Sequence, residues 1–213
     1  MIWIDPQLPA ARTRIQALAD VFRQEDILPG GLYEVFEAVG RHQFIKLIEL
    51  GLLPESRVLD VGCGVLRAGY WLIHFLRPGC YFGIEPSLRD LEAGQRVLLT
   101  PELLAEKRPS FDRNDQFDFS VFGTKFDFVL ARSVWSHASL SEIDRMLEQF
   151  ALWGEAGSVF ITSWIRTDDP AMEYPGSKRF LDSTLRGLAE KRGLIAQVEE
   201  TVQLQTWMRI MHP

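Results

Sequence analysis

The chain has 213 residues, of which 46% are hydrophobic, and this length suits one well-buried domain rather than two. Its net charge is -6, from 23 basic and 29 acidic side chains. Nucleic acid is therefore not expected as a partner, because a polyanion needs a positive surface. Cys63 and Cys80 show no metal-ligand spacing, so neither a disulfide framework nor a metal site is predicted. With no signal-like segment and no apolar run near membrane-spanning length, a cytoplasmic protein without membrane contact is expected.

The N-terminal part of the chain is predicted to be helical. Residues 10–25 place apolar side chains at helical spacing, and Pro29-Gly30-Gly31 ends that segment. A second helix is expected over 32–50. We therefore interpret 1–52 as a helical cap on a domain that covers 53–213.

The rest of the chain alternates segments of strand length with amphipathic segments of helical length. Ser87 and Ser141 stand where helix N-caps are expected, and residues 108–122 have no clear pattern. This alternation predicts a parallel sheet covered by helices, with ligands bound at the carboxyl ends of the strands. The predicted strands are 57–61, 80–85, 126–131, 157–163, 194–202 and 205–211, and the predicted helices are 66–76, 87–99, 141–153 and 177–191.

The most informative feature joins two of these strands. The first reads Val58-Leu-Asp-Val-Gly-Cys-Gly64, and the second, Tyr81-Phe-Gly-Ile-Glu85, ends in a carboxylate. A glycine turn after a buried strand lets the backbone approach a ligand, because no Cβ stands in the way. An acidic side chain about 20 residues later can accept hydrogen bonds from both hydroxyls of a ribose. The pair predicts a nucleoside-containing cofactor.

A dinucleotide is the competing cofactor. Its fingerprint requires Gly or Ala at the sixth position of the glycine loop, where helix and strand pack closely. Arg67 occupies that position here, which disfavours a nicotinamide or flavin. Two roles stay open for Arg67: contact with a cofactor carboxylate, or a solvated position at the sheet edge.

Four motifs, in order, resemble those of the class I S-adenosylmethionine-dependent methyltransferases, over roughly residues 42–200. The resemblance implies S-adenosylmethionine as the cofactor. It also implies an α/β fold, a three-layer α/β/α sandwich with a seven-stranded, mostly parallel sheet whose last strand is antiparallel. The motifs are segment 58–64, Glu85, Asp115-Gln116 twelve residues before Asp127, and segment 126–137.

The same resemblance implies a role for each part of the site. The glycine loop holds the methionine part, Glu85 the ribose, and Asp115 the adenine amino group. For Asp60, a contact with the cofactor through water and a structural role in holding the loop remain equally open. Leu66 replaces the usual third glycine, which leaves the path of the loop in question. The residues expected to bind the cofactor are Asp60, Gly62, Cys63, Gly64, Arg67, Glu85, Pro86, Ser87, Asp115, Gln116, Ala131, Arg132 and Ser133.

His137 is the candidate catalytic residue, because it follows the strand that faces the transferred methyl group. An imidazole in that place can take a proton from an acceptor hydroxyl or amine. The alternative is a structural histidine that packs against Trp135 or binds a backbone carbonyl. For His42, on the inner side of the second helix, a structural role is favoured over a place in the pocket.

The acceptor is expected to be a small molecule, methylated at oxygen, nitrogen or carbon. Metal-dependent relatives in the resembled family carry a carboxylate where Ala131 stands, so a metal-independent reaction is expected. The acceptor pocket is assigned to Tyr33, Phe36, His42 and Phe44, or to the loop 164–174. A protein that binds S-adenosylmethionine without methyl transfer remains the alternative, and the oligomeric state is expected to be monomer or homodimer.

Overall fold

The structure is a computed structural model that describes residues 14–169, 176–202 and 204–213. Its centre is a sheet with strand order β3-β2-β1-β4-β5-β8-β7, and a short strand, β6, pairs with β5 beside this path. Strands β1 to β5 run parallel, whereas β8 runs antiparallel to both β5 and β7. The predicted mostly parallel sheet with an antiparallel last strand is confirmed. The strands are β1 (Val58–Val61), β2 (Tyr81–Ile84), β3 (Ser110–Asp112), β4 (Phe128–Ala131), β5 (Val159–Arg166), β6 (Arg179–Phe180), β7 (Ile195–Val202) and β8 (Gln205–Met211).

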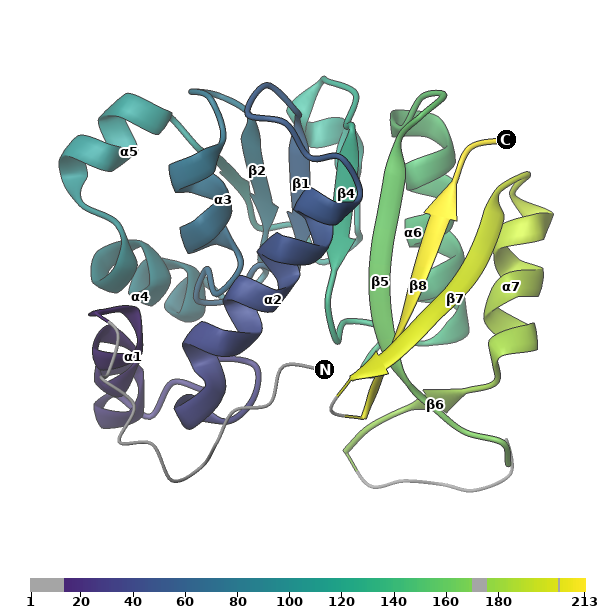
Figure 1. Cartoon of the computed structure of the whole chain (residues 1–213), viewed down its shortest axis with the longest axis horizontal. Coiled ribbons are helices and arrows are strands. Elements are labelled where there is room, and N and C mark those ends of the chain that lie inside the picture. The colour runs from purple at the N-terminus through teal and green to yellow at the C-terminus, as the bar shows by residue number, and fades with distance from the viewer. Residues whose placement is uncertain (1–13, 170–175, 203) are drawn as a thin grey trace.

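Helices cover both faces of this sheet, which gives the three layers (Figure 1). Figure 1 shows α2 and α3 in front of the sheet and α6 behind it. The helices are α1 (Arg14–Gln24), η1 (Tyr33–Val35), α2 (Phe36–Glu49), α3 (Gly69–Phe75), α4 (Leu88–Leu98), α5 (Pro101–Lys107), η2 (Phe119–Phe122), α6 (Leu140–Trp153) and α7 (Asp182–Lys191).

The central strands are buried on both faces and feed two hydrophobic clusters. Val58 of β1 belongs to the cluster under α1 to α4, and the next residue, Leu59, belongs to the cluster under α6 and α7. This alternation follows from the two-residue period of a strand. Both faces of β1 are therefore apolar, as in parallel sheets covered on both sides.

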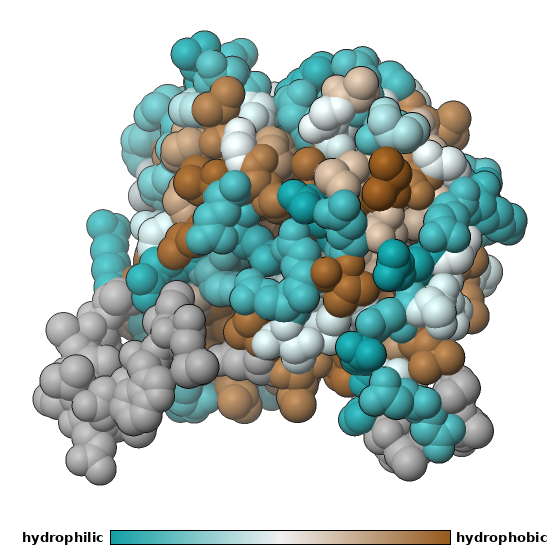
Figure 2. All heavy atoms as spheres, turned by 45° about the vertical axis from the view of Figure 1, so that its right-hand side comes forward, coloured by the Kyte–Doolittle hydropathy of each residue, from teal (hydrophilic) through white to brown (hydrophobic). Residues whose placement is uncertain are grey.

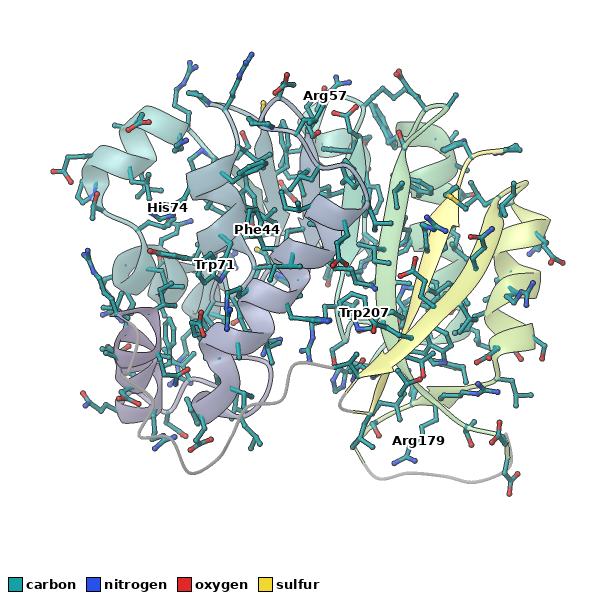
Figure 3. All side chains as sticks on the ribbon, viewed as in Figure 1. Phe44, Arg57, Trp71, His74, Arg179 and Trp207 are labelled. Carbon is teal, nitrogen blue, oxygen red and sulfur yellow. The ribbon has the colours of Figure 1, made fainter. Side chains whose placement is uncertain are left out.

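Helices α1 and α2 pack into the first of these clusters. Phe44 of α2 stacks on Trp71 of α3 with ring centroids 6.3 Å apart, and Figure 3 shows the two rings between the helices. Gly40 permits a close approach, because a Cβ at this position would lie 2.3 Å from the backbone oxygen of Arg67. At the other end of the sheet, the ammonium nitrogen of Lys46 in α2 lies 5.4 Å from the ring centroid of Trp207 in β8. Figure 3 labels Trp207. The N-terminal helices thus reach across the sheet from α3 to β8.

The described part of the chain contains no candidate membrane-spanning helix. No described helix there combines the length and apolar character needed to cross a bilayer. Figure 2 shows hydrophilic side chains over the middle of the face turned to the viewer, with hydrophobic ones in small groups between them.

Two predicted boundaries are wrong, each for a local reason. Helix α6 is capped by Ser139, not by Ser141, because the Ser139 hydroxyl and the Glu142 carboxylate form a capping box. Strand β5 continues to Arg166, so Trp164 is a buried strand residue rather than the start of a loop. Residues 170–175 of that predicted loop lie outside the described residues, as do residues 1–13.

Three further differences concern helices. Helix α3 begins at Gly69 instead of residue 66, because turns occupy the residues before it. Helix α7 begins at Asp182 instead of residue 177, since β6 takes part of that segment. Helix α5 was not predicted, although Thr100 before Pro101 is a typical helix start, and the Thr100 hydroxyl indeed accepts from the amide of Leu103.

Candidate active site

A cavity of about 220 Å³ opens at the carboxyl ends of β1 and β4. It combines the glycine loop, the segment after β4, and part of the N-terminal helical region. Eight of the residues predicted for the site meet here. The lining residues are Pro29, Gly30, Gln43, Asp60, Gly62, Cys63, Gly64, Val65, Arg67, Ala68, Arg132, Ser133, Val134 and His137.

The glycine loop follows a left-handed path at alternate residues. Gly62, Gly64 and Leu66 have φ values of 68°, 52° and 62°. A side chain at Gly62 is excluded, since its Cβ would lie 2.8 Å from the side chain of Val134. Leu66 therefore adopts the conformation usual for glycine, at a cost of roughly 1 kcal/mol, and its fully buried side chain holds it there. The missing third glycine has not changed the hand of the backbone.

Backbone hydrogen bonds tie this loop to β2. The amides of Gly62 and Cys63 both donate to the carbonyl of Ile84, at 2.8 and 3.1 Å. Cys63 is buried, and burial raises the pKa of its thiol well above the usual value. The thiol is therefore a packing group in the loop, and Gly83 leaves the space for it, since a Cβ there would meet the sulfur at 2.9 Å.

Glu85 is the residue that joins the two strands of the sequence motif. Its Oε2 accepts a hydrogen bond from the amide of Gly64 at 2.9 Å, and its Oε1 accepts one from the amide of Ser87 at 2.9 Å. Each carboxylate oxygen has further lone pairs for a ligand hydroxyl. Glu85 is half-buried and lies beside the loop without lining the cavity itself.

Asp60 is the buried acid of the site. Its Oδ2 accepts a hydrogen bond from the Tyr81 hydroxyl at 2.9 Å. Burial raises the pKa of Asp60 to about 7, although the Tyr81 hydrogen bond and the charge of Arg67 both oppose this effect. A Cβ at Gly69 would lie 2.7 Å from the Tyr81 hydroxyl, so this glycine keeps the Asp60–Tyr81 pair in place. Asp60 therefore lines the cavity as a carboxyl group that changes its protonation state near neutral pH.

Two arginines line the same cavity. Arg67 donates from Nη1 to the carbonyl of Gly30 at 3.1 Å, and its guanidinium touches the Gly30-Gly31 turn. Arg132 immediately follows β4. Burial lowers the pKa of both guanidinium groups, and for Arg67 the charge of Arg132 lowers it further. The cavity wall is thus positively charged.

A buried polar network holds the segment after β4. Ser133 has a left-handed φ of 65°, a strained conformation for a residue with a side chain. Its amide donates to Ser163 Oγ at 3.0 Å, and its hydroxyl accepts from Gln205 Nε2 at 3.3 Å. Ser163 in turn donates to Gln205 Oε1 at 2.9 Å. Strands β5 and β8 thereby fix the backbone at Ser133, within the segment that runs from Arg132 to His137.

His137 lines the cavity with an exposed side chain. Its amide donates to the carbonyl of Val134 at 2.9 Å, which closes a turn after Ser133. Trp135, by contrast, is fully buried against Phe160. The exposed place of His137 on the cavity wall is compatible with the role of general base.

Besides Glu85, five further predicted cofactor residues lie outside the cavity wall. Ala131 is fully buried at the end of β4, and its carbonyl accepts from Thr162 Oγ1 at 2.9 Å. Pro86 is exposed, and Ser87 caps α4. Asp115 and Gln116 are exposed beyond β3, where Gln116 donates to Asp115 at 2.9 Å and accepts from Arg145 at 2.6 Å. Contact of these five residues with a cofactor stays a prediction.

The four side chains expected to form the acceptor pocket do not line the cavity. Phe36 is buried with Phe22, and Phe44 stacks on Trp71. Tyr33 donates its hydroxyl to the carbonyl of Ile27, at 3.1 Å. His42 packs on Trp207 near Glu200, which is the structural role favoured for it.

Gln43, Pro29 and Gly30 take their place and were missed. Gln43 is buried, and its Nε2 donates to the carbonyl of Val39 at 3.1 Å. A polar residue between the apolar positions Val39 and Leu47 of one helix face was the available signal for it.

Among the described residues, no three His, Cys, Asp or Glu side chains come together as a metal site would require.

Comparisons with known proteins bear on the family and the fold of the chain. A sterol 24-C-methyltransferase of Schizosaccharomyces pombe is 26% identical over 145 residues, which is 65% of this chain and 36% of that protein. The chain thus spans little more than a third of that relative.

Solved structures share the fold. A magnesium protoporphyrin IX methyltransferase of Synechocystis PCC 6803, solved with bound S-adenosylhomocysteine, is 20% identical with a TM-score of 0.62, over 86% of this chain and 88% of that one. An S-adenosylmethionine-dependent methyltransferase of Clostridium acetobutylicum is 10% identical with a TM-score of 0.64, over 93% and 98% of the two chains. A family model described as a methyltransferase domain matches residues 6–207. The chain therefore belongs to the methyltransferase domain family, within the class I, S-adenosylmethionine-dependent methyltransferases.

Proposed function

We propose that this protein transfers the methyl group of S-adenosylmethionine to a small-molecule acceptor at oxygen, nitrogen or carbon. The observation that best supports this proposal is the hydrogen bond of 2.9 Å that the amide of Gly64 donates to Glu85. This hydrogen bond joins Glu85, the residue expected to bind the ribose, to the glycine loop, whose glycines have no Cβ to block a ligand. S-adenosylmethionine consists of a nucleoside and an amino-acid part, and Glu85 and the adjacent glycine loop are placed to bind one part each.

The residues present fit this cofactor. Gly62 and Gly64 line the cavity, and nothing lies within 4 Å of a Cβ placed at Gly64, so backbone is accessible there for the methionine part. Glu85 retains lone pairs for ribose hydroxyls. Arg67 supplies a cation for the cofactor carboxylate, while Asp60 and Gln43 supply oxygen atoms at the same wall for its ammonium group. When bound, S-adenosylmethionine supplies an electrophilic methyl group on a sulfonium. Ala131, Ser133 and Asp115 are kept as proposed cofactor residues.

Arg132 and residues 134–137 belong to the acceptor side in this proposal, which moves Arg132 from the cofactor role expected from the sequence to a role toward the acceptor. Methyl transfer requires the nucleophile, the carbon and the sulfur to be held in line, so positioning dominates the rate. The network of Ser133, Ser163 and Gln205 gives that segment a fixed backbone. His137 is the proposed general base for an acceptor that must lose a proton.

The N-terminal helical region, 1–52, is proposed to be a cap over a catalytic domain of 53–213. Pro29, Gly30 and Gln43 from that region line the cavity, which supports this role. We also propose a cytoplasmic protein that is a monomer or homodimer.

The test combines binding with turnover. Calorimetry with S-adenosylhomocysteine reports the cofactor site, and transfer of label from methyl-labelled S-adenosylmethionine to a panel of small-molecule acceptors reports catalysis. Binding together with label transfer is the expected result. Tight binding without transfer to any acceptor of a broad panel would instead favour a protein that uses the cofactor without methyl transfer, and absence of binding would refute the assignment.

A further inference from the structure

The cavity of this acidic protein is lined by positive charge. The whole chain has a net charge of -6, yet two guanidinium groups, of Arg67 and Arg132, lie on the wall of one cavity. Within the described part of the chain, Asp60 is the sole carboxylate on that wall, and it is engaged with the Tyr81 hydroxyl. The cavity is therefore locally positive, although the protein as a whole is negatively charged.

Neither arginine has a carboxylate partner within 4.0 Å among the described residues. Arg67 donates to a neutral carbonyl, that of Gly30. Arg132 is half-buried, and no hydrogen bond or ion pair joins it to the described residues. Other half-buried arginines of the protein are paired: Arg192, for example, makes a two-pronged contact with Asp144 at 2.9 and 2.8 Å. Two neighbouring cations that form no ion pair with the described residues are suited to bind anions in a cavity.

The two arginines stand on different sides of the cavity. Arg67 is part of the glycine-loop side, next to the backbone that is assigned to the methionine part of the cofactor. Arg132 follows β4 and begins the segment that runs to His137. S-adenosylmethionine carries one carboxylate, which Arg67 satisfies, so the guanidinium of Arg132 is left over.

We infer that Arg132 binds an anionic group of the methyl acceptor, and that the acceptor is a small molecule carrying a carboxylate or a similar oxyanion. This inference rests on the proposed function. A guanidinium forms two parallel hydrogen bonds with a carboxylate, which fixes the orientation of the acceptor as well as its position. An anion at Arg132 is also attracted by the sulfonium, because both positive charges face the same cavity. Ser133, held by Ser163 and Gln205, keeps Arg132 at a fixed place on the wall.

The decisive experiment compares acids with their neutral amides. Protein saturated with S-adenosylhomocysteine is titrated with benzoate and with benzamide, and label transfer from S-adenosylmethionine is measured for a panel of acceptors supplied as acid and amide pairs. The variants are Arg132→Gln, Arg132→Lys and Arg67→Gln, with Arg186→Gln on the exposed side of α7 as the matched control. Thermal unfolding of each variant establishes that it is folded.

The expected result is binding and turnover of the acid form over the amide form. Arg132→Gln should abolish this preference and raise KM for the acid by about tenfold or more, while its affinity for S-adenosylhomocysteine stays within about threefold of wild type. Arg132→Lys should recover part of the preference, and Arg67→Gln should weaken S-adenosylhomocysteine binding instead.

Equal binding and turnover of acids and amides by the wild type would overturn the inference and leave methyl transfer intact. So would a preference for acids that survives in Arg132→Gln. A wild type that binds no S-adenosylhomocysteine would contradict the proposed function itself, so the two failures are distinguishable.

Discussion

Glu85 accepts a hydrogen bond from the amide of Gly64 at 2.9 Å, across the ends of two neighbouring strands. The side chain that is expected to hold the ribose therefore also holds the loop that is expected to hold the methionine part. Loss of this carboxylate should affect both halves of the cofactor site.

Glu85→Ala is expected to weaken S-adenosylhomocysteine binding by about tenfold or more, because two charge-assisted hydrogen bonds to the ribose and the anchor of the loop are lost together. Glu85→Gln keeps an oxygen for the Gly64 amide and should lose less. Calorimetry measures both, with Glu106→Ala on the exposed side of α5 as control. Unchanged affinity in Glu85→Ala would show that the ribose lies elsewhere.

Asp60 should make stability depend on pH. Burial raises the pKa of this carboxyl from 3.8 to about 7, so the folded protein keeps a proton that the unfolded chain releases. The stability that this group contributes is present below the unfolded pKa and is lost as the pH rises through the folded pKa, by about 4 kcal/mol if the charge is not compensated.

Asp60→Asn removes that titration and still accepts from Tyr81. Its melting temperature relative to wild type should therefore increase as the pH is raised from 5 to 8. Parallel pH profiles for the two proteins would mean that Asp60 is not protonated in the folded state.

Two glycines of equal helical context should respond in opposite directions to alanine. A Cβ at Gly40 would lie 2.3 Å from the Arg67 backbone oxygen and 3.1 Å from Trp71 Nε1, whereas nothing lies within 4 Å of one at Gly187. Gly40→Ala should destabilise the fold by about 1 to 3 kcal/mol and weaken cofactor binding through Arg67. Gly187→Ala should stabilise it by about 0.5 to 1 kcal/mol, because alanine is the better helix former. Urea unfolding distinguishes the two, and equal effects would contradict the packing of α2 on α3.

Lys46 joins α2 to the last two strands. Its ammonium lies 2.8 Å from Glu199 and 3.0 Å from Glu200, with 8% of its side chain exposed. Lys46→Ala should cost about 2 to 3 kcal/mol, because both the ion pairs and the packing of its stem on Trp207 are lost. Lys46→Met keeps the apolar stem and should cost roughly half as much. If urea unfolding gave the same loss of stability for Lys46→Ala and Lys46→Met, the apolar stem of Lys46 would have no packing role.

Ser163→Ala should impair the site more than its neighbour Thr162→Val does. The Ser163 hydroxyl accepts from the strained Ser133, whereas the Thr162 hydroxyl donates to the buried Ala131 carbonyl. Each substitution leaves a buried polar group without a partner and should cost about 1 to 3 kcal/mol. Only Ser163→Ala should also lower kcat in the methyl-transfer assay, and equal effects on kcat would contradict a role for the network in positioning.

The sequence by itself determined the parts of the protein that depend on neighbouring residues. The strand at 58–61, the glycine turn and Glu85 were readable because strand burial, a Cβ-free turn and a carboxylate at a strand tip each leave a local pattern. The parallel sheet followed from the alternation of strands and helices. Helix ends were less secure: Ser139 and Ser141 both precede a helical pattern, and the capping box with Glu142 selects the first.

Only the tertiary structure decided which side chains meet around the cavity. Aromatic residues of α2 were expected in the pocket, but the hydrophobic effect favours burial of Phe36 in the core and packing of the partly buried Phe44 against it. Gln43 lines the cavity instead, because Gly40 lets α2 approach Arg67 closely, and Gly30 lines it beside Arg67. The two unpaired arginines are neighbours across 65 residues of sequence, a proximity that only the pairing of β1 with β4 creates. Local pattern thus predicted the glycine turn and Glu85, whereas long-range packing produced the positive charge of the cavity.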